Sequence, residues 1–427
     1  GSNAWFEMEA EDMLPEGFTC PHCGKSAGFE KETDTLDGWF DSGSTHYAAM
    51  ERDQGFWPAT MYIEGLDQYR GWFQSSLLVA VGALGRGAPF KECLTHGWTV
   101  DGQGRAMHKS LGNGMDPAEI FNKYGADLLR LWAGSSDYHV DVRCSDDIFK
   151  QLSQNYLKFR NTAKFCLDNL TGFDPEQLVA AADMQELDRW AVTRLNSLIR
   201  RVFDSYDAYE FHAVSHAIND FCVVDLSSFY FDIIKDRLYC DGENSLSRRS
   251  AQTALFLIVD AMTRMFAPIL AFTCEEIWLA MPHRSADDSR SVLFNCMVQP
   301  YEDYALPQDA MDRWARIAAV RSAVNGALEQ ARADKTIGKS LEAEVDVTVP
   351  AEDAFLAELN ADTLADLLIV SQVRVTVGDA LTVTVAPAQG VKCARCWKVL
   401  TSVGTVAGHD TLCPRCAAVV KALPVVE

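Results

Sequence analysis

A glycine-rich segment from Gly102 to Gly114 carries an isolated lysine and an adjacent serine, Lys109 and Ser110. Its four glycines lift the Cβ restriction on the backbone, so the segment can move and can approach a ligand closely. A lysine on such a loop can deliver a positive charge to a phosphate group during a reaction. A solvated surface turn is the alternative reading of a string of this kind, and the upstream sequence decides between the two.

A second polar cluster follows a strand-like run at residues 60–65 and opens a helical run. It contains Glu64, Gly65, Asp67 and Gln68. Carboxylates accept hydrogen bonds from ribose hydroxyls or an ammonium group, and a glycine allows close backbone approach to a ligand. The cluster is therefore suited to a ligand that carries hydroxyl and amino groups. Asp37, Asp41 and Glu64 could suggest a catalytic carboxylate pair, but nothing in the sequence pairs them, so solvated acids are the simpler interpretation.

Four cysteines near the end of the chain form two C-x-x-C pairs separated by sixteen residues. Each pair places two thiolates on one turn, and two such turns can surround a zinc ion tetrahedrally. Because all four ligands would be thiolates, no coordination position stays open, and the predicted Zn²⁺ is structural. The predicted ligands are Cys393, Cys396, Cys413 and Cys416. The neighbouring Trp397 is either a core residue of this small module or a stacking platform for a nucleobase.

A third C-x-x-C pair, Cys20 and Cys23, supplies only half a site, and its partner ligands would lie outside this chain. We therefore assign no metal there. The other seven of the thirteen cysteines are scattered in mostly apolar surroundings, as expected of buried free thiols. This usage indicates a reducing cytoplasm and not a disulfide framework.

Two G-K-S strings, at 24–26 and 338–340, end like a phosphate-binding P-loop. The glycine that a P-loop needs five residues earlier is replaced by Thr19 and Ala333. A P-loop NTPase is therefore excluded.

The net charge of −22 argues against DNA or another nucleic acid over the whole surface. Residues 391–427 nevertheless carry five basic and two acidic side chains, a net charge of +3, so RNA is allowed at this end. The most apolar long segment, residues 251–272, is interrupted by Asp260 and Arg264, which indicates a buried helix and no membrane partner. Residues 1–4 read as a cloning remnant, and no apolar secretion signal follows them.

The elements that must position these groups fall into successive regions. Residues 5–145 mix strands and helices, with helices expected at 70–84 and 117–132. Helical periodicity dominates afterwards, at 152–170, 187–203, 209–235, 250–281 and 310–334. Alternating runs at 341–349, 373–377 and 381–385 predict strands around a helical run at 352–368. The fold class is therefore multidomain, α/β plus α-helical.

Four stretches together resemble bacterial isoleucyl-tRNA synthetases, a branch of the class I aminoacyl-tRNA synthetases. Residues 39–44 (WFDSGS) are similar to the element with which that family re-enters its catalytic domain, and residues 64–77 to its aminoacyl-adenylate strand and helix. Residues 106–113 (AMHKSLGN) resemble the KMSKS loop. The string TIGKSLEA at 336–343 and the CARCW…CPRC ribbon resemble the isoleucine branch specifically.

The resemblance implies the second half of a Rossmann-type catalytic domain at 5–145 and a helical-bundle anticodon-binding domain at 146–335. A small α+β module at 336–388 and a zinc ribbon at 389–427 would follow. It further implies that Glu64, Gly65, Asp67 and Gln68 line the adenylate pocket, and that Lys109 and Ser110 bind the phosphates of ATP. Lys109 would be the catalytic residue. ATP with Mg²⁺, isoleucine and tRNA-Ile are the implied substrates and partners.

The sequence departs from the family pattern in two ways. The first lysine and first serine of KMSKS are Ala106 and His108 here. No H-x-G-H string, the HIGH motif of the class, occurs in the chain, and the editing insertion is also missing. An aliphatic pocket alone detects one methylene only weakly, as is well established for isoleucine against valine in this same enzyme family, which therefore needs the insertion. We expect this chain alone to be an inactive fragment of the enzyme.

Two alternatives remain at this stage. The region from about 146 onward could be a free-standing tRNA-binding protein with a zinc ribbon. The chain could also belong to a synthetase for valine, leucine or methionine, although TIGKSLEA and the ribbon favour isoleucine.

Overall fold

The computed structural model describes residues 3–423 and, at Lys109, the backbone alone. The described chain forms two compact units. The first runs to Trp98 and includes His139–Asp141, and the second contains Thr99–Tyr138 and the chain from Val142 onward. No helix among residues 3–423 is long and apolar enough to cross a membrane.

The first unit is built around two parallel strands, β1 (Ala59–Gly65) and β2 (Phe90–His96), as the sequence predicts for residues 60–65. The predicted helix at 70–84 is confirmed as α4 (Trp72–Leu78), which continues into a π-helix at Val79–Ala83. The other helical segments are α1 (Ala4–Glu7), η1 (Glu11–Met13), α2 (Gly38–Gly43), η2 (His46–Glu51), α3 (Arg52–Gln54) and η3 (Leu66–Arg70).

Two contacts fix α4 against the rest of this unit. The buried hydroxyls of Tyr62 on β1 and Ser76 on α4 are 2.9 Å apart, and the Tyr62 ring stacks on Trp72 with centroids 4.4 Å apart. A Cβ on Gly43 would lie 2.6 Å from Cβ of Ser75, so only glycine lets α2 approach α4 this closely. The glycine of the WFDSG string is therefore a packing requirement.

The second unit begins with β3 (Thr99–Val100), which pairs in parallel with β4 (Val142–Arg143). Between them lie η5 (Lys109–Leu111), α5 (Pro117–Tyr124) and α6 (Ala126–Ser135). We expect one helix over 117–132, and this is wrong: Gly125, at φ +85°, separates two helices. Glycine adopts this left-handed conformation without a Cβ penalty, and the chain turns there.

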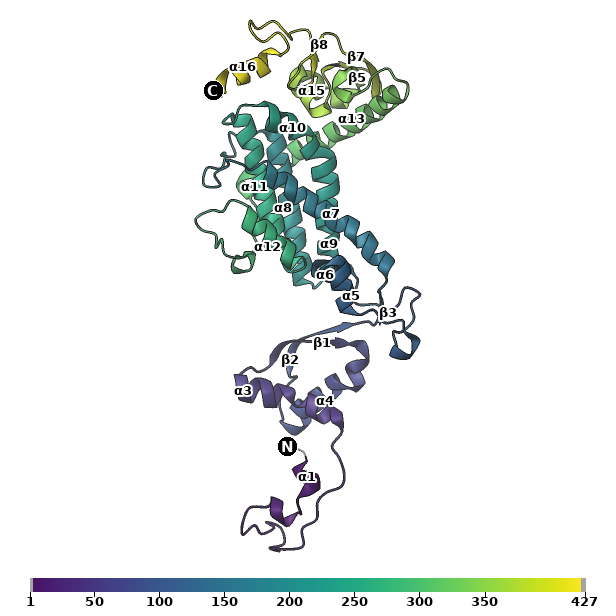
Figure 1. Ribbon diagram of the computed structural model, residues 1–427, viewed down its shortest axis with the longest axis vertical. Helices are drawn as coiled ribbons and strands as arrows, with labels where there is room; N and C mark the ends of the chain where they lie inside the picture. Colours follow the sequence, from purple (N-terminus) through teal and green to yellow (C-terminus); the bar gives the residue numbers. More distant parts are fainter. Residues whose placement is uncertain (1–2, 424–427) are drawn as a thin grey trace. The chain divides into compact units, whose positions relative to one another are not determined.

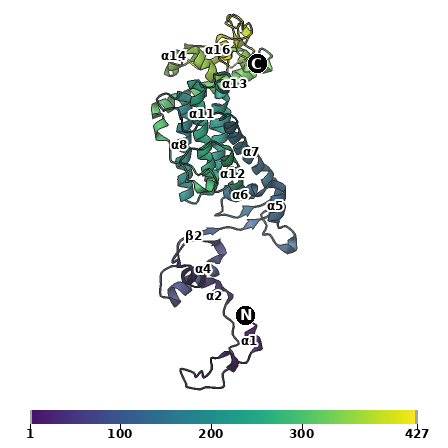
Figure 2. The same cartoon turned by 60° about the vertical axis from the view of Figure 1, so that its left-hand side comes forward.

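A bundle of long helices follows and forms the main body of this unit (Figures 1 and 2). Its members are α7 (Asp146–Asp168), α8 (Glu186–Asp207), α9 (Phe211–Asp220), the π-helix η6 (Phe221–Tyr230), α10 (Phe231–Cys240), α11 (Leu246–Phe266), α12 (Ala271–Ala280) and α13 (Gln308–Ala333). The predicted helical segments at 152–170, 187–203, 209–235 and 310–334 are confirmed. The single helix expected over 250–281 is wrong, because the chain turns at 267–270, where Pro268 cannot donate a backbone hydrogen bond.

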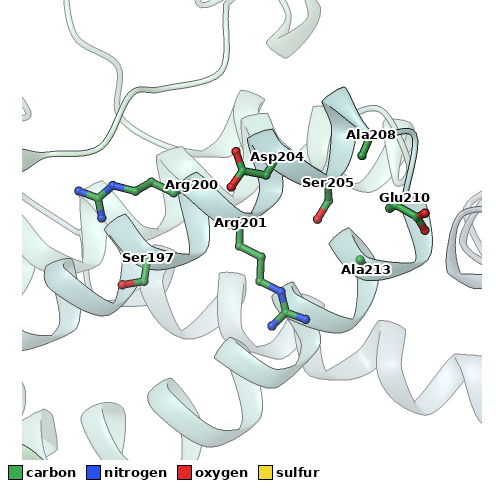
Figure 3. A pocket seen from close by; sticks show the side chains of 8 residues that line it. All are labelled: Ser197, Arg200, Arg201, Asp204, Ser205, Ala208, Glu210 and Ala213. Carbon is green, nitrogen blue, oxygen red and sulfur yellow. The ribbon is translucent and has the colours of Figure 1, made fainter.

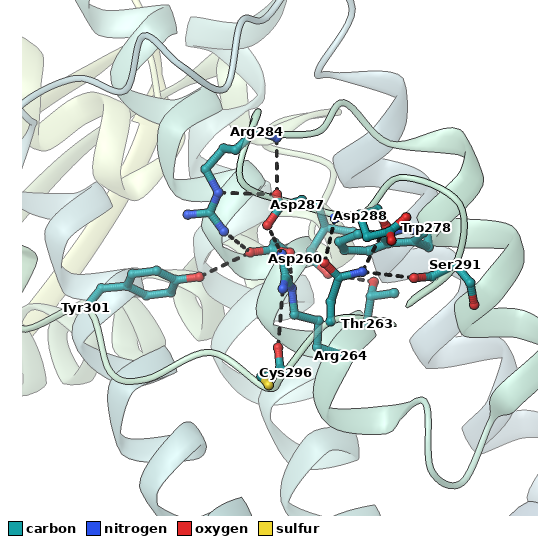
Figure 4. Close-up of polar contacts among 12 residues, drawn as sticks. Asp260, Thr263, Arg264, Trp278, Arg284, Asp287, Asp288, Ser291, Cys296 and Tyr301 are labelled. Atoms are coloured by element: carbon teal, nitrogen blue, oxygen red, sulfur yellow. Dashed lines mark hydrogen bonds and ion pairs between the residues drawn. The ribbon is translucent and has the colours of Figure 1, made fainter. Parts of the chain in front are cut away.

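The core of the bundle is continuous along α11, where every residue from Ser250 to Phe266 is buried. Asp260 and Arg264, which interrupt the apolar run in the sequence, are joined by an ion pair of 2.7 Å and are almost fully buried. Arg284 contacts the other oxygen of Asp260 at 2.7 Å, and Arg264 also pairs with Asp287 at 2.7 Å (Figure 4). Burial raises the pKa of Asp260, although both arginines oppose the shift. These pairs attach the irregular segment 282–307 to the bundle.

The small α+β module is confirmed. Its three-stranded sheet has the order β6 (Gln372–Val377), β5 (Ala343–Val349), β7 (Thr382–Pro387), with β5 parallel to β6 and antiparallel to β7. The run expected to be helical at 352–368 forms α14 (Phe355–Glu358) and α15 (Ala361–Leu368), after a short turn at Ala351–Asp353. The chain ends in a ribbon made of β8 (Val391–Lys392), β9 (Val399–Leu400) and α16 (Pro414–Ala422).

Candidate functional site

The glycine-rich loop is closed around the carboxylate of Asp101. Oδ1 of Asp101 accepts the backbone N–H groups of Gln103 and Arg105 at 3.0 and 2.9 Å, and Oδ2 accepts Nε of Arg105 at 2.8 Å. Nδ2 of Asn113, at the far end of the loop, donates to the same Oδ2 at 2.9 Å. The hydrogen bond from Asn113 and the N–H of Arg105 hold the pKa of Asp101 well below its usual range.

Asn113 also organises the segment that contains the lysine. Its Nδ2 donates to the carbonyl of Ala106 at 3.0 Å, and its Oδ1 accepts the N–H of His108 at 2.9 Å. Val100 and Ala106 form an antiparallel bridge that closes the base of the loop. The sequence predicts a loop that can move, and the structure places Lys109 on a short 3₁₀ turn, Lys109–Leu111, within this hydrogen-bonded loop. Ser110 is exposed on the same turn.

The second predicted cluster lies at the carboxyl end of β1, in the first unit. Glu64 is half-buried, and its Oε1 accepts the N–H of Gly65 at 2.9 Å. Gln68 accepts the N–H of Trp72 at 3.0 Å, so its side chain caps the start of α4. A Cβ on Gly65 would lie 2.8 Å from Oδ1 of Asp67, so the carboxylate of Asp67 lies close against the backbone of Gly65. The structure therefore brings Glu64, Gly65, Asp67 and Gln68 together at a strand end, where α/β sheets bind ligands.

The four cysteines of the ribbon converge on one point. All four are buried, and their sulfur atoms lie within 4.8 Å of one another, with Cys396 and Cys413 3.9 Å apart. Four sulfurs at ~2.3 Å from a common centre would be separated by similar distances, so the cluster fits a tetrahedral zinc ion. Burial opposes ionisation of Cys393, but the N–H groups of Cys396 and Cys413 outweigh it and lower the pKa of that thiol to about 6.

The first C-x-x-C pair, Cys20 and Cys23, forms a turn like those of the ribbon, but no second C-x-x-C turn of the described chain lies opposite it. The N–H of Cys20 donates to the carbonyl of Lys25, and the N–H of Gly24 donates to the carbonyl of Cys20, both at 2.8 Å. The N–H groups of Cys23 and His22 lower the pKa of Cys20. Within residues 3–423 no further side chains of the metal-binding types gather around this pair. This pair is therefore left without an assigned metal.

A concave site of about 530 Å³ lies along the carboxyl-terminal part of α8 and the start of α9 (Figure 3). Arg200 and Arg201 extend from α8 in different directions, and Asp204 and Glu210 line the same site. Arg200 forms an ion pair with Glu302, so its charge is compensated. The mixture of charges gives this concavity no preference for an anion or a cation.

Three family models match successive parts of the chain. "tRNA synthetases class I (I, L, M and V)" matches residues 1–145, "Anticodon-binding domain of tRNA ligase" matches 188–347, and "Zinc finger found in FPG and IleRS" matches 390–419. The chain is thus similar to the class I tRNA synthetases over residues 1–145. The part that matches the zinc finger contains all four clustered cysteines, which supports a structural Zn²⁺ ion.

Curated relatives extend the match over nearly the whole chain. The isoleucine–tRNA ligase of Caldanaerobacter subterraneus subsp. tengcongensis is 46% identical, and that of Syntrophotalea carbinolica is 47% identical. Each match covers 98% of this chain and 46% of the relative, so the chain spans about half the length of the curated relatives it matches.

A solved structure supports the fold. A leucyl-tRNA synthetase from Agrobacterium radiobacter K84, solved as a ternary complex with tRNA, is 19% identical with a TM-score of 0.52. The match covers 78% of this chain and 37% of the leucyl enzyme.

The structure also contains functional candidates that the sequence did not indicate. Asp101 and Asn113 close the loop of Lys109 from positions twelve residues apart. Arg395 and Arg415, at the third position of each C-x-x-C turn, contact α10 across more than 150 residues of chain. The sequence does contain a signal for these two residues, because arginine occupies the third position of both C-x-x-C turns.

Proposed function

We propose that this chain is the carboxyl-terminal part of an isoleucine–tRNA ligase. The supporting observation is the identity of 46–47% with proteins of that name over 98% of the chain. The full-length enzyme would join isoleucine to ATP to form isoleucyl-adenylate and release pyrophosphate, and would then transfer the isoleucyl group to tRNA-Ile. In this proposal the domains are those expected from the sequence, at 5–145, 146–335, 336–388 and 389–427.

The cluster at the end of β1 would bind the aminoacyl-adenylate. Glu64 and Asp67 supply acceptors for an ammonium or a ribose hydroxyl, and Gly65 allows the backbone to approach the ligand. The side-chain oxygen of Gln68 accepts the N–H of Trp72. Its amide nitrogen lies 3.4 Å from the carboxylate of Asp67 and would orient that carboxylate.

Lys109 would neutralise the phosphates of ATP while the isoleucine carboxylate attacks the α-phosphorus. Phosphoryl-type transfer depends mainly on positioning and on charge stabilisation in the transition state, which a lysine held in an ordered loop can supply. Ser110 would donate to a phosphate oxygen from the same turn. Because Ala106 takes the place of the first lysine of the motif, Lys109 carries this role without a second lysine from the loop.

The helices matched by the anticodon-binding model and the ribbon would contact tRNA-Ile. Of the two roles predicted for Trp397, its exposure favours the second: the side chain is 57% exposed and therefore is not a core residue. Lys339 lies over its ring, with Nζ 5.7 Å from the centroid. An exposed aromatic ring beside a cation is typical of surfaces that stack on RNA bases. Zinc would be held by Cys393, Cys396, Cys413 and Cys416, and the protein would act in the cytoplasm.

Filter binding of the zinc-loaded chain to transcripts of tRNA-Ile, tRNA-Val, tRNA-Leu and tRNA-Met tests the isoleucine assignment. We expect the tightest binding with tRNA-Ile at a fixed salt concentration, since phosphate contacts alone are common to all four. Equal binding to the four transcripts would contradict it. The chain alone should not catalyse isoleucine-dependent ATP–pyrophosphate exchange.

A further inference from the structure

The two C-x-x-C turns of the ribbon carry arginine at the same position, Cys393-Ala394-Arg395-Cys396 and Cys413-Pro414-Arg415-Cys416. Both arginines leave the ribbon and contact the last turns of α10 or the residue after it. Zinc binding requires the two turns to be in place, and the same turns set the position of both arginines. The metal site and the docking of the ribbon are therefore linked through these two side chains.

Arg395 caps the carboxyl end of α10. Its Nη1 donates to the carbonyl of Cys240, and its Nη2 donates to the carbonyl of Tyr239 at 3.3 Å. These are two of the last carbonyls of the helix, which have no partner inside it and carry its partial negative charge. The guanidinium group of Arg395 donates hydrogen bonds to these carbonyls and places its positive charge beside their partial negative charge. Nη1 of Arg395 also lies 3.9 Å from Sγ of Cys416, so the same group faces the cysteine cluster.

Arg415 makes the second contact, on the side of α10. Its two terminal nitrogens pair with the two oxygens of Asp236, with Nη2 2.8 Å from Oδ1, and Asp241 lies 3.6 Å away. A bidentate arginine–carboxylate pair fixes orientation as well as distance. Asp236 and Asp241 would otherwise place two negative charges against a cysteine cluster that, with zinc bound, has a net charge of about −2 from four thiolates and one dication.

Cys240 is covered where the ribbon packs against the end of α10, beside Arg395. It is 6% exposed, packs in the same buried group as the four clustered cysteines, and its Sγ lies 3.8 Å from the carbonyl of Arg395. The ribbon also binds the α+β module through Ser371, whose Oγ accepts the N–H of Val399 at 2.7 Å. The ribbon is thus held on two sides, and the α10 side depends on the arginines.

We propose that Arg395 and Arg415 are positioning residues that transmit the zinc state of the ribbon to α10. With zinc bound, they hold the ribbon against α10 and complete a cavity of about 390 Å³ that Ile233, Ile369 and Trp397 help to line. Without zinc, the turns lose their shape, the arginines withdraw and Cys240 becomes accessible. This inference rests on the proposed zinc site, and it adds that zinc controls the surface that presents Trp397.

Alkylation of Cys240 by N-ethylmaleimide, followed by peptide mass spectrometry, measures docking separately from zinc content. Arg415→Ala is the first variant because Arg415 does not itself cover Cys240. We expect one zinc per chain to be retained and the alkylation rate of Cys240 to rise at least tenfold. Asp236→Asn removes the same pair from the α10 side and should give the same increase. Arg313→Ala is the control, because the ion pair of Arg313 with Asp309 lies within α13.

Removal of zinc from the unmodified chain with a chelator should expose Cys240 to a similar extent, and added zinc should restore protection. Continued protection of Cys240 in zinc-loaded Arg415→Ala, or after chelation, would overturn the inference. Loss of zinc from Arg415→Ala would also overturn it, because the arginine would then support the metal site itself. A chain that never binds zinc would contradict the proposed metal site, which the zinc assay reports independently.

Discussion

Asn113 donates a hydrogen bond of 2.9 Å to the carboxylate of Asp101 and thereby joins the two ends of the loop that carries Lys109. The same amide binds the backbone of Ala106 and His108, so one side chain sets the shape of the segment. The ordered loop is thus built from a buried carboxylate and an amide, and glycines supply the turns: Gly104 and Gly112 both have positive φ.

Replacement of Asn113 by alanine should open this loop. A hydrogen bond to a charged group contributes about 1.5–3 kcal/mol, so we expect tryptic cleavage after Arg105 to be about 10–100 times faster. Limited proteolysis of the chain, followed by mass spectrometry, gives the rate. Leu111→Ala is the matched control, since the side chain of Leu111 is exposed and its N–H still donates to the carbonyl of His108. Equal cleavage rates in the two variants would show that Asn113 does not order the loop.

His46 should make the first unit sensitive to acid. Its ring is 1% exposed and lies against the backbone of Ser76. Burial lowers its pKa below the ordinary value, the Ser76 backbone and Glu51 oppose this shift, and Arg86 reinforces it. As the pH falls through about 6.5, the imidazole of His46 is protonated in the unfolded chain before it is protonated in the folded chain. The free energy of unfolding therefore decreases.

His46→Phe keeps an aromatic ring in this place and removes the titration. Urea unfolding at about pH 7.5 and about pH 5, on either side of the ordinary histidine pKa, should show a smaller loss of stability on acidification in this variant than in the unmodified chain. His22→Phe, at an exposed position of the same unit, should leave the loss unchanged. A loss of the same size in His46→Phe and in the unmodified chain would rule out His46 as its source.

Asp260→Asn should destabilise the second unit strongly. Arg264 and Arg284 each lose a charged partner, and Arg264 is 7% exposed. Removing one member of a buried ion pair costs about 3–5 kcal/mol, measured here by urea unfolding followed by circular dichroism. Asp288→Asn is the control because Asp288 pairs with the exposed Arg290, a surface pair that contributes about 0–1 kcal/mol. Similar losses in both variants would contradict a structural role of the buried network.

Trp397→Ala should weaken binding of tRNA-Ile. Stacking of a base on an aromatic side chain contributes about 1–3 kcal/mol, so the dissociation constant should increase about 5- to 150-fold. Trp98→Ala is a well-matched control, because Trp98 is also 57% exposed but lies in the first unit. Filter binding at constant salt compares them, and zinc content shows that the ribbon is intact. Unchanged affinity in Trp397→Ala would remove Trp397 from the RNA-binding surface.

The features that the sequence predicted are those that short-range patterns determine. The two C-x-x-C turns, the strands at 341–349, 373–377 and 381–385, and the cluster from Glu64 to Gln68 each occupy one short stretch of chain. The helix breaks at Gly125 and near Pro268 were missed because the apolar periodicity continues through both positions. A single glycine or proline changes the backbone direction without changing that pattern.

Contacts between distant segments could not be predicted from such patterns. The pair of Arg415 and Asp236 spans 179 residues, and nothing near either residue specifies the other. The same holds for Arg264 with Asp287: the sequence shows Arg264 only as an interruption of an apolar segment, and nothing near it specifies Asp287. The role of Lys109 stays a prediction, since its position on the loop follows from the sequence but its contacts do not.

The most direct test of the proposed function is isoleucine-dependent ATP–pyrophosphate exchange by the full-length enzyme to which we assign this chain. Lys109→Ala should lower kcat/KM by about 10²–10³-fold, as expected for loss of a group that stabilises charge in the transition state. Lys158→Ala, which removes an exposed lysine of α7, should leave the exchange unchanged. Near-normal exchange by Lys109→Ala, or faster exchange with valine, leucine or methionine than with isoleucine, would contradict the assignment.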